Sequence, residues 1–248
     1  MRALTAIWLL LRGLLHLLGG WWTIRLHFGR WSQAEREARV QRWAREFLRI
    51  WRIGLEVHGQ PPRSGPMLLV ANHISWLDIL VLHAAGFCRF VSKAEVRRWP
   101  LVGTLATGAG TLYIERASHR DALRVVHHMK EALQRGEVLA VFPEGTTSNG
   151  IALLPFHANL IQAAISAQAA VQPVALQFVD AATGRLSLAP IYVGDESLVT
   201  SVWRTLTTPG LRAVLRYGPP QSPEGRERRA WASRLREAVD ELRSAAPE

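Results

Sequence analysis

Residues 68–80 read LLVANHISWLDIL, and the first part of this stretch has the composition of a buried β-strand. The apolar run LLVA leads directly into Asn72-His73, and Asp78 follows five residues after the histidine. Short continuous apolar runs are typical of strands that are covered on both faces, as in a parallel sheet. Ligand sites of open α/β sheets lie beyond the carboxyl ends of such strands. An imidazole and a carboxylate at this strand end therefore predict a functional site.

Short apolar runs alternate with helical stretches from residue 55 onward, and this alternation predicts an α/β domain over 55–248. The sheet should be mostly parallel and flanked by helices. The expected strands are 55–59, 66–72, 89–93, 111–116, 138–142, 171–179 and 211–217. The expected helices are 75–85, 119–135, 156–168, 195–206 and 226–244.

Four of the expected strands end in groups that carry chemistry: the ends read VAN-H, FVS-K, YIE-R and VFP-EGT. The carboxyl ends of parallel strands share one edge of a sheet, so these groups should meet there. The residues that we expect at this edge are His73, Asp78, Lys93, Arg116, Glu144 and Gly145. A histidine whose second nitrogen is held by a carboxylate is a general base with a fixed tautomer, and the two cations suit an anionic substrate.

Several other kinds of site are not supported by the sequence. It contains no G-x-S-x-G, H-E-x-x-H or G-x-x-x-x-G-K-[ST] motif, and Cys88 has no activating neighbour. There is no Cys/His cluster at metal-binding spacing. The enzyme therefore lacks a nucleophile of its own, and we expect the hydroxyl of an acceptor to attack an already activated acyl carbon directly.

The charge of the chain is concentrated near its N-terminus. The net charge is +10, and residues 1–60 hold ten arginines against four acidic residues and six of the ten tryptophans. Arginine and tryptophan on an apolar background are typical of a membrane interface. Nucleic acid is a weaker candidate partner, since nucleic-acid-binding proteins rarely contain a stretch such as ALTAIWLLLRGLLHLL (3–18). The single cysteine excludes a disulfide framework and indicates a reducing compartment, which places the expected site of action at the cytoplasmic face of the inner (plasma) membrane.

Residues 1–54 predict an amphipathic helical hairpin that docks on anionic lipid. Residues 3–24 have the length of a spanning helix, but Arg12 and His16 interrupt them near the middle, where charge is costly. We expect this helix to lie in one leaflet with a narrow polar stripe facing outward, although its length leaves a spanning helix open. The stripe consists of Arg2, Thr5, Arg12, His16 and Thr23. The second helix begins at Ser32 with a capping box that includes Glu35. Its basic face could also be simply solvated, with the helix packed on the core.

Four short blocks, in order, carry a resemblance to a known family. They are Asn72-His73-x-x-x-x-Asp78, Gly110-x-x-x-x-Glu115-Arg116, Phe142-Pro143-Glu144-Gly145-Thr146 and the apolar stretch through Val171-x-Pro173-Val174. Together they resemble the blocks of the glycerolipid acyltransferases, whose best-known bacterial members are the 1-acyl-glycerol-3-phosphate (lysophosphatidate) acyltransferases. The match runs from about residue 55 to 180. Any one block is weak evidence, but all four in this order are highly specific.

The resemblance implies that His73 is the base and that Asp78 orients it. It also implies that acyl-CoA or acyl-carrier protein donates the acyl group, with no cofactor, and that a lysolipid accepts it. Glu144, Gly145 and Thr146 resemble the block that shapes the acceptor site, and Arg116 resembles its phosphate contact. Lys93 is added to the acceptor site by the argument from strand ends.

One departure from the family pattern concerns the acceptor. The family usually has an arginine that meets the acceptor phosphate at the position where this chain has Thr147. A charged hydrogen bond is worth about 1.5–3 kcal/mol, so either Arg116 and Lys93 suffice or the acceptor has no phosphate monoester. We expect lysophosphatidate, which would give phosphatidic acid. The alternatives are lyso-ornithine lipid and, from a different class of function, a non-catalytic membrane-surface scaffold of the same fold.

Overall fold

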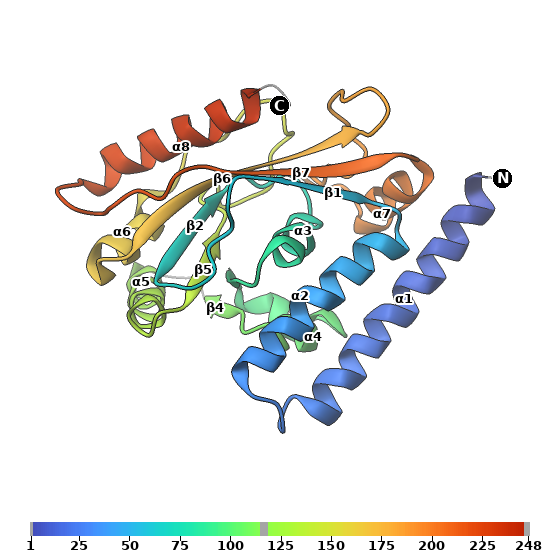
Figure 1. Ribbon diagram of the computed structural model, residues 1–248, viewed down its shortest axis with the longest axis horizontal. Coiled ribbons are helices and arrows are strands. Elements are labelled where there is room, and N and C mark those ends of the chain that lie inside the picture. The colour runs from blue at the N-terminus through green and yellow to red at the C-terminus, as the bar shows by residue number, and fades with distance from the viewer. Residues whose placement is uncertain (1, 115–118, 246–248) are drawn as a thin grey trace.

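The computed structural model describes residues 2–114 and 119–245, and it shows one α/β fold built on a seven-stranded sheet (Figure 1). The strand order is β1-β7-β6-β2-β5-β3-β4. The strands are β1 (Gly54–His58), β2 (Met67–Ala71), β3 (Arg89–Lys93), β4 (Leu112–Ile114), β5 (Val138–Val141), β6 (Ala170–Asp180) and β7 (Leu211–Tyr217). Among the described strand pairs only β6 and β7 run antiparallel, so the expectation of a mostly parallel sheet is confirmed.

Helices cover both faces of the sheet. They are α1 (Arg2–His27), α2 (Gln33–Ile50), α3 (Asp78–Ala85), α4 (Val102–Gly108), α5 (His119–Gln134), α6 (Ala158–Ala167), α7 (Leu198–Thr207) and α8 (Arg228–Ser244), with a 3-10 turn η1 (Ala94–Arg98). The sequence did not predict η1 and α4, which follow β3. They are short, and their composition is too rich in glycine, threonine and charged residues to show an apolar period.

Two hydrophobic cores hold the layers together. One contains Phe47 of α2, Leu82 of α3 and Leu176 of β6. The other lies on the opposite face and contains Met129 of α5 and Trp231 of α8. Each large buried side chain contributes roughly 1.5–3 kcal/mol through its removal from water. The first core includes residues of α1 and α2, so the N-terminal hairpin is packed on the sheet domain, and the boundary at residue 54 stays a sequence-based division.

The hairpin of α1 and α2 is held by close packing at two glycines. A Cβ at Gly13 would lie 2.4 Å from Nε1 of Trp51, and a Cβ at Gly20 would lie 2.6 Å from Nε1 of Trp43. Positions seven residues apart share one face of a helix, so the two glycines make a flat surface on which the tryptophan rings lie. The capping box of α2 is present as expected, since the Ser32 side chain accepts from the Glu35 amide.

His16 corrects part of the expectation for α1. We expected it on an outward polar stripe, but its ring stacks on Trp43 at 5.1 Å and its Nε2 lies 3.0 Å from the Trp43 carbonyl oxygen. The reason is that residue 16 lies between Gly13 and Gly20 on the face that packs against α2. The other face of α1 leaves a row of large apolar side chains exposed: Leu4, Ile7, Trp8, Leu11, Leu14, Leu15, Leu18, Trp22 and Leu26. By length and composition, α1 is apolar enough to cross a membrane.

Candidate active site

The order of the strands brings the expected site residues to one edge of the sheet. Strands β2, β5, β3 and β4 are neighbours and all run parallel, so their carboxyl ends lie on the same side. His73 follows β2, Glu144 follows β5 and Lys93 ends β3. Lys93 is exposed and lies two strands from β2, which is roughly 10 Å at the usual strand spacing.

His73 and Asp78 form a direct pair. Nδ1 of His73 lies 2.7 Å from Oδ2 of Asp78. A carboxylate only accepts hydrogen bonds, so Nδ1 carries the proton in this pair and Nε2 is left with its lone pair. Within the described part of the chain Nε2 has no hydrogen-bond partner, and the imidazole is 19% exposed. The pair therefore presents a basic nitrogen at the surface of the strand-end edge.

Asp78 is fully buried and organises the loop between β2 and α3. Its Oδ2 also accepts from the backbone amides of Ile74 at 2.7 Å and Ser75 at 2.9 Å. Its Oδ1 is buried without a hydrogen-bond partner among the described residues. One carboxylate oxygen thus fixes both the backbone turn and the ring of His73, which explains why the acid follows the histidine by five residues.

Asn72 fixes the other end of this loop to the neighbouring strand. Its Nδ2 donates to the carbonyl oxygen of Leu176 at 2.9 Å, and its Oδ1 accepts from the Leu176 amide at 2.7 Å. The Asn72 side chain is fully buried and therefore continues the β2–β6 ladder where the β2 backbone turns away. The sequence showed Asn72 only as part of a motif and gave no sign of this role.

Glu144 supports His73 from the adjacent strand end. Its Oε1 accepts from the His73 amide at 2.8 Å, and its Oε2 accepts from the Leu154 amide at 2.9 Å. Burial raises the pKa of Glu144 above its ordinary value, while the bonds from these amides and from the Ser148 side chain oppose that rise. Ser148 completes the link, since its amide donates to the His73 carbonyl oxygen at 2.7 Å. Both oxygens of Glu144 are thus occupied by backbone amides.

The imidazole of His73 lies on an aromatic ring. Phe142, at the end of β5, stacks on it with the ring centroids 4.0 Å apart, and Phe142 in turn stacks on Phe90 at 5.6 Å. Beyond Phe90 the ring of His83 packs edge-on at 5.0 Å. Burial lowers the pKa of His83 to about 4, so His83 is neutral and belongs to the core beneath the site. Phe142 thus covers one face of the imidazole of His73, which remains 19% exposed.

A family model described as acyltransferase matches residues 54–177, which hold all of these strand ends. The chain belongs to the acyltransferase family. Two of its relatives are named for lysolipid acceptors. A lyso-ornithine lipid O-acyltransferase of Pseudomonas aeruginosa is 40% identical over 75% of this chain and 70% of its own length. A 1-acyl-sn-glycerol-3-phosphate acyltransferase of Neisseria gonorrhoeae is 38% identical over 75% of this chain and 73% of its own length.

The fold of this acyltransferase is that of a solved relative. The crystal structure of the 1-acyl-sn-glycerophosphate (LPA) acyltransferase PlsC from Thermotoga maritima superposes with a TM-score of 0.71 over 100% of both chains, at 19% identity. The family resemblance and the α/β fold expected from the sequence are therefore confirmed. The chain is an acyltransferase of the lysolipid family, and the comparisons name two different acceptors at similar identity.

Two further expected acceptor residues of the acyltransferase, Gly145 and Thr146, lie in the turn after β5. Gly145 adopts a φ of +75°, which favours glycine, and its amide donates to the Phe142 carbonyl oxygen at 3.1 Å. Thr146 is exposed and Thr147 is half-buried. Arg116 lies outside the described residues. The roles assigned to these residues stay predictions.

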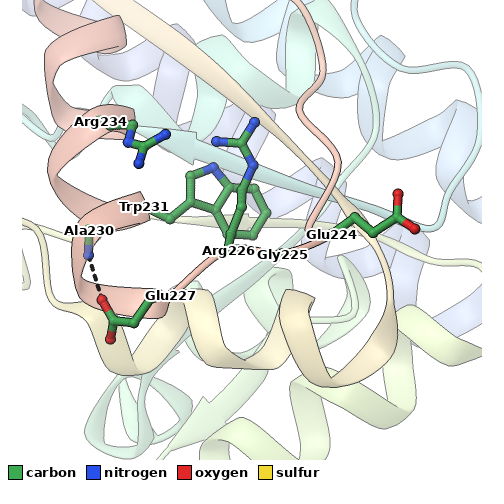
Figure 2. A pocket seen from close by; sticks show the side chains of 7 residues that line it. All are labelled: Glu224, Gly225, Arg226, Glu227, Ala230, Trp231 and Arg234. Carbon is green, nitrogen blue, oxygen red and sulfur yellow. Dashed lines mark hydrogen bonds between the residues drawn. The ribbon is translucent and has the colours of Figure 1, made fainter.

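A hollow of about 390 Å³ at the start of α8 does not belong to this site. Figure 2 shows its lining, in which the Glu227 side chain accepts from the Ala230 amide and so caps α8. Arg226 lies over the ring of Trp231 at 5.1 Å. The helix α8 packs on the sheet face opposite α2 and α3. Glu227 and Arg226 are thus engaged in holding the start of a helix.

Replacing Glu144 by Gln tests its support of His73. A glutamine has one oxygen to accept with, so one of the two backbone amides would face an NH₂ group and stay unpaired. We expect Glu144→Gln to lower the free energy of unfolding by about 1–3 kcal/mol, measured by urea denaturation, and to lower kcat by displacing His73. The control is Glu241→Gln, at an exposed position of α8. Equal stability and activity of the two variants would contradict the support role.

Proposed function

We propose that this protein transfers an acyl chain from acyl-CoA or acyl-carrier protein to the free hydroxyl of a lysolipid at a membrane surface. Lysophosphatidate is the acceptor that we propose first, with phosphatidic acid as product. The observation that carries the proposal is the His73–Asp78 pair, whose Nδ1···Oδ2 distance of 2.7 Å leaves Nε2 free at the strand-end edge. Membership of the lysolipid acyltransferases supports the reaction class.

In the proposed reaction Nε2 of His73 takes the proton of the acceptor hydroxyl as its oxygen attacks the thioester carbonyl carbon. Asp78 keeps the proton on Nδ1 and stabilises the imidazolium that forms. When the tetrahedral intermediate collapses, the carbon–sulfur bond breaks and the thiol leaves with the proton from Nε2. The products are an ester and a free thiol. The thioester supplies the driving force, so the reaction as proposed uses no cofactor.

We propose different tasks for the expected acceptor residues. Glu144 acts as a positioning residue in our proposal, because both of its oxygens already accept from backbone amides. Lys93 is exposed at the end of β3, where its ammonium can meet an anionic head group. Gly145 and Thr146 shape the turn beside His73, and Arg116 stays our candidate for the phosphate contact.

We further propose that α1 docks on the cytoplasmic leaflet of the inner membrane. Its row of exposed leucine and tryptophan side chains lies opposite the glycine face that packs on α2. An apolar face of this length binds a lipid surface by burial, and the arginines of α2 add attraction to anionic lipid. Docking of this kind would bring the strand-end edge to the lysolipid.

Lyso-ornithine lipid is the second candidate acceptor, and position 147 favours it. Thr147 stands where the family usually has the arginine that meets the acceptor phosphate. The similarity to the lyso-ornithine lipid O-acyltransferase of Pseudomonas aeruginosa supports the same alternative. Its head group carries no phosphate, so the missing guanidinium would cost nothing in binding.

Replacing His73 by Ala tests the proposed reaction. A positioned general base contributes roughly 10²–10⁴ to the rate, so we expect His73→Ala to lose at least a hundredfold in acyl transfer to lysophosphatidate while vesicle binding is unchanged. The matched control is His128→Ala on an exposed face of α5. Acyl transfer by His73→Ala within tenfold of wild type would remove His73 from the role of base.

Replacing Thr147 by Arg tests the acceptor. If the phosphate of lysophosphatidate lies beside position 147, the added guanidinium should raise kcat/KM for lysophosphatidate relative to lyso-ornithine lipid by roughly tenfold, as expected for one charged hydrogen bond. A ratio of the two kcat/KM values that does not move in Thr147→Arg would show that position 147 does not contact the head group.

Replacing Lys93 by Ala tests the other cation of the acceptor site. Lys93→Ala should raise the KM for the acceptor and leave the donor KM unchanged.

A further inference from the structure

A second hollow lies where the tip of the N-terminal hairpin meets the helices after β3, and three arginines line it. It has a volume of about 500 Å³ and is lined by Ile24, Arg25, Phe28, Gly29, Arg36, Arg97, Gly103, Thr104, Thr107 and Gly108. These residues come from the end of α1, the start of α2, η1 and α4. None of them belongs to the catalytic pair or to the expected acceptor site.

No described acidic residue neutralises the three arginines of this hollow. Within the described residues Arg25, Arg36 and Arg97 form no ion pair and no side-chain hydrogen bond. The guanidinium groups of Arg25 and Arg97 lie over the rings of Trp21 and Tyr113, at 4.9 Å and 5.9 Å, and these contacts leave their charge unpaired. Nε of Arg36 is buried without a hydrogen-bond partner. No acidic residue is among the described residues that line the hollow. Like charges that converge without an acid repel one another, and a bound anion would relieve that repulsion.

The remaining lining leaves room for such an anion. Gly103, Thr104, Thr107 and Gly108 lie on one face of α4, and they are small or carry a hydroxyl group. The Thr107 hydroxyl donates to the Gly103 carbonyl oxygen at 2.7 Å, whereas the Thr104 side chain has no hydrogen bond among the described residues. A Cβ at Gly108 would lie 2.5 Å from Cδ1 of Ile24, so glycine lets α4 approach α1 here.

The apolar rim of the hollow indicates that the anion is the head group of a lipid and not a soluble phosphate compound. The large apolar neighbours of the arginines are exposed: Trp22 and Leu26 around Arg25, and Trp99 and Val102 after Arg97. The exposed apolar face of α1 continues into this rim. A soluble phosphate compound needs no such surroundings, whereas the head group of a phospholipid lies at the boundary between charge and acyl chains.

We propose that this hollow binds the phosphate of an anionic phospholipid that serves as an anchor and is separate from the acyl acceptor. The inference rests on the proposed membrane docking and adds a defined lipid site to it. Arg25 and Arg97 would contact the phosphate from two sides, and Arg36 would approach it from α2. Bound lipid would thereby hold the hairpin tip against α4, beside the strand that ends in Lys93.

The test compares binding to vesicles of phosphatidylcholine alone and with added phosphatidylglycerol. The double variant Arg25→Gln/Arg97→Gln removes two charges that line the hollow, and the control Arg42→Gln/Arg49→Gln removes two charges of α2 outside it; all four arginines are exposed. We expect the hollow variant to lose about tenfold more affinity for the phosphatidylglycerol vesicles than the control, since charged hydrogen bonds are lost only there. Equal losses of affinity in the two variants would overturn the proposed lipid site, because only general attraction between the arginines and the anionic vesicle would then remain.

A second variant fills the hollow without changing the charge. Thr104→Phe should weaken binding to phosphatidylglycerol vesicles and leave binding to pure phosphatidylcholine as it is. Unchanged binding to both would overturn the proposal, as would displacement of the protein from phosphatidylglycerol vesicles by coenzyme A or inorganic phosphate. Wild-type protein that binds vesicles but transfers no acyl group would contradict the proposed reaction only, so the two failures are distinguishable.

Discussion

The hydrogen bond from Nδ1 of His73 to Oδ2 of Asp78 is the interaction on which the site depends. A carboxylate buried as completely as that of Asp78 is stable only if donors surround it, because desolvation of an unpaired charge costs several kcal/mol. The donors are the imidazole and two amides of its own loop. The Asp78 carboxylate therefore holds the turn, the start of α3 and the orientation of the base together. A change in one of these features disturbs the other two.

The rest of the sheet keeps this loop in place. Asn72 bonds it to β6, and Glu144 and Ser148 bond the two sides of the His73 backbone to the end of β5. The aromatic ring of Phe142 then covers one face of the imidazole. Parallel strands make this possible, since they bring chain segments far apart in the sequence to the same edge. The hairpin adds an apolar surface on the side of α1 that the protein leaves uncovered.

The parts of the fold and of the site that depend on local sequence patterns could be predicted from the sequence. All seven strands were expected because their apolar runs are short and bounded by polar turns. The His73–Asp78 pair was expected because both residues follow an apolar strand and match the first block of the family. The inward position of His16 was missed, since it depends on Trp51 and Trp43 of α2 lying over Gly13 and Gly20 of α1. The support given by Glu144 and the cluster of Arg25, Arg36 and Arg97 join segments far apart in the sequence, and no local signal marks them.

The tautomer of His73 is the most direct measure of whether Asp78 prepares the base. In protein labelled with ¹⁵N-histidine, the nitrogen chemical shifts of His73 distinguish the two neutral forms, and His73→Gln assigns the signal. The structure predicts that in the neutral imidazole Nδ1 carries the proton and Nε2 does not, and that Asp78→Ala abolishes this preference. A resting enzyme in which Nε2 carries the proton and Nδ1 does not would contradict the account, because Nε2 could then not accept the proton of a hydroxyl.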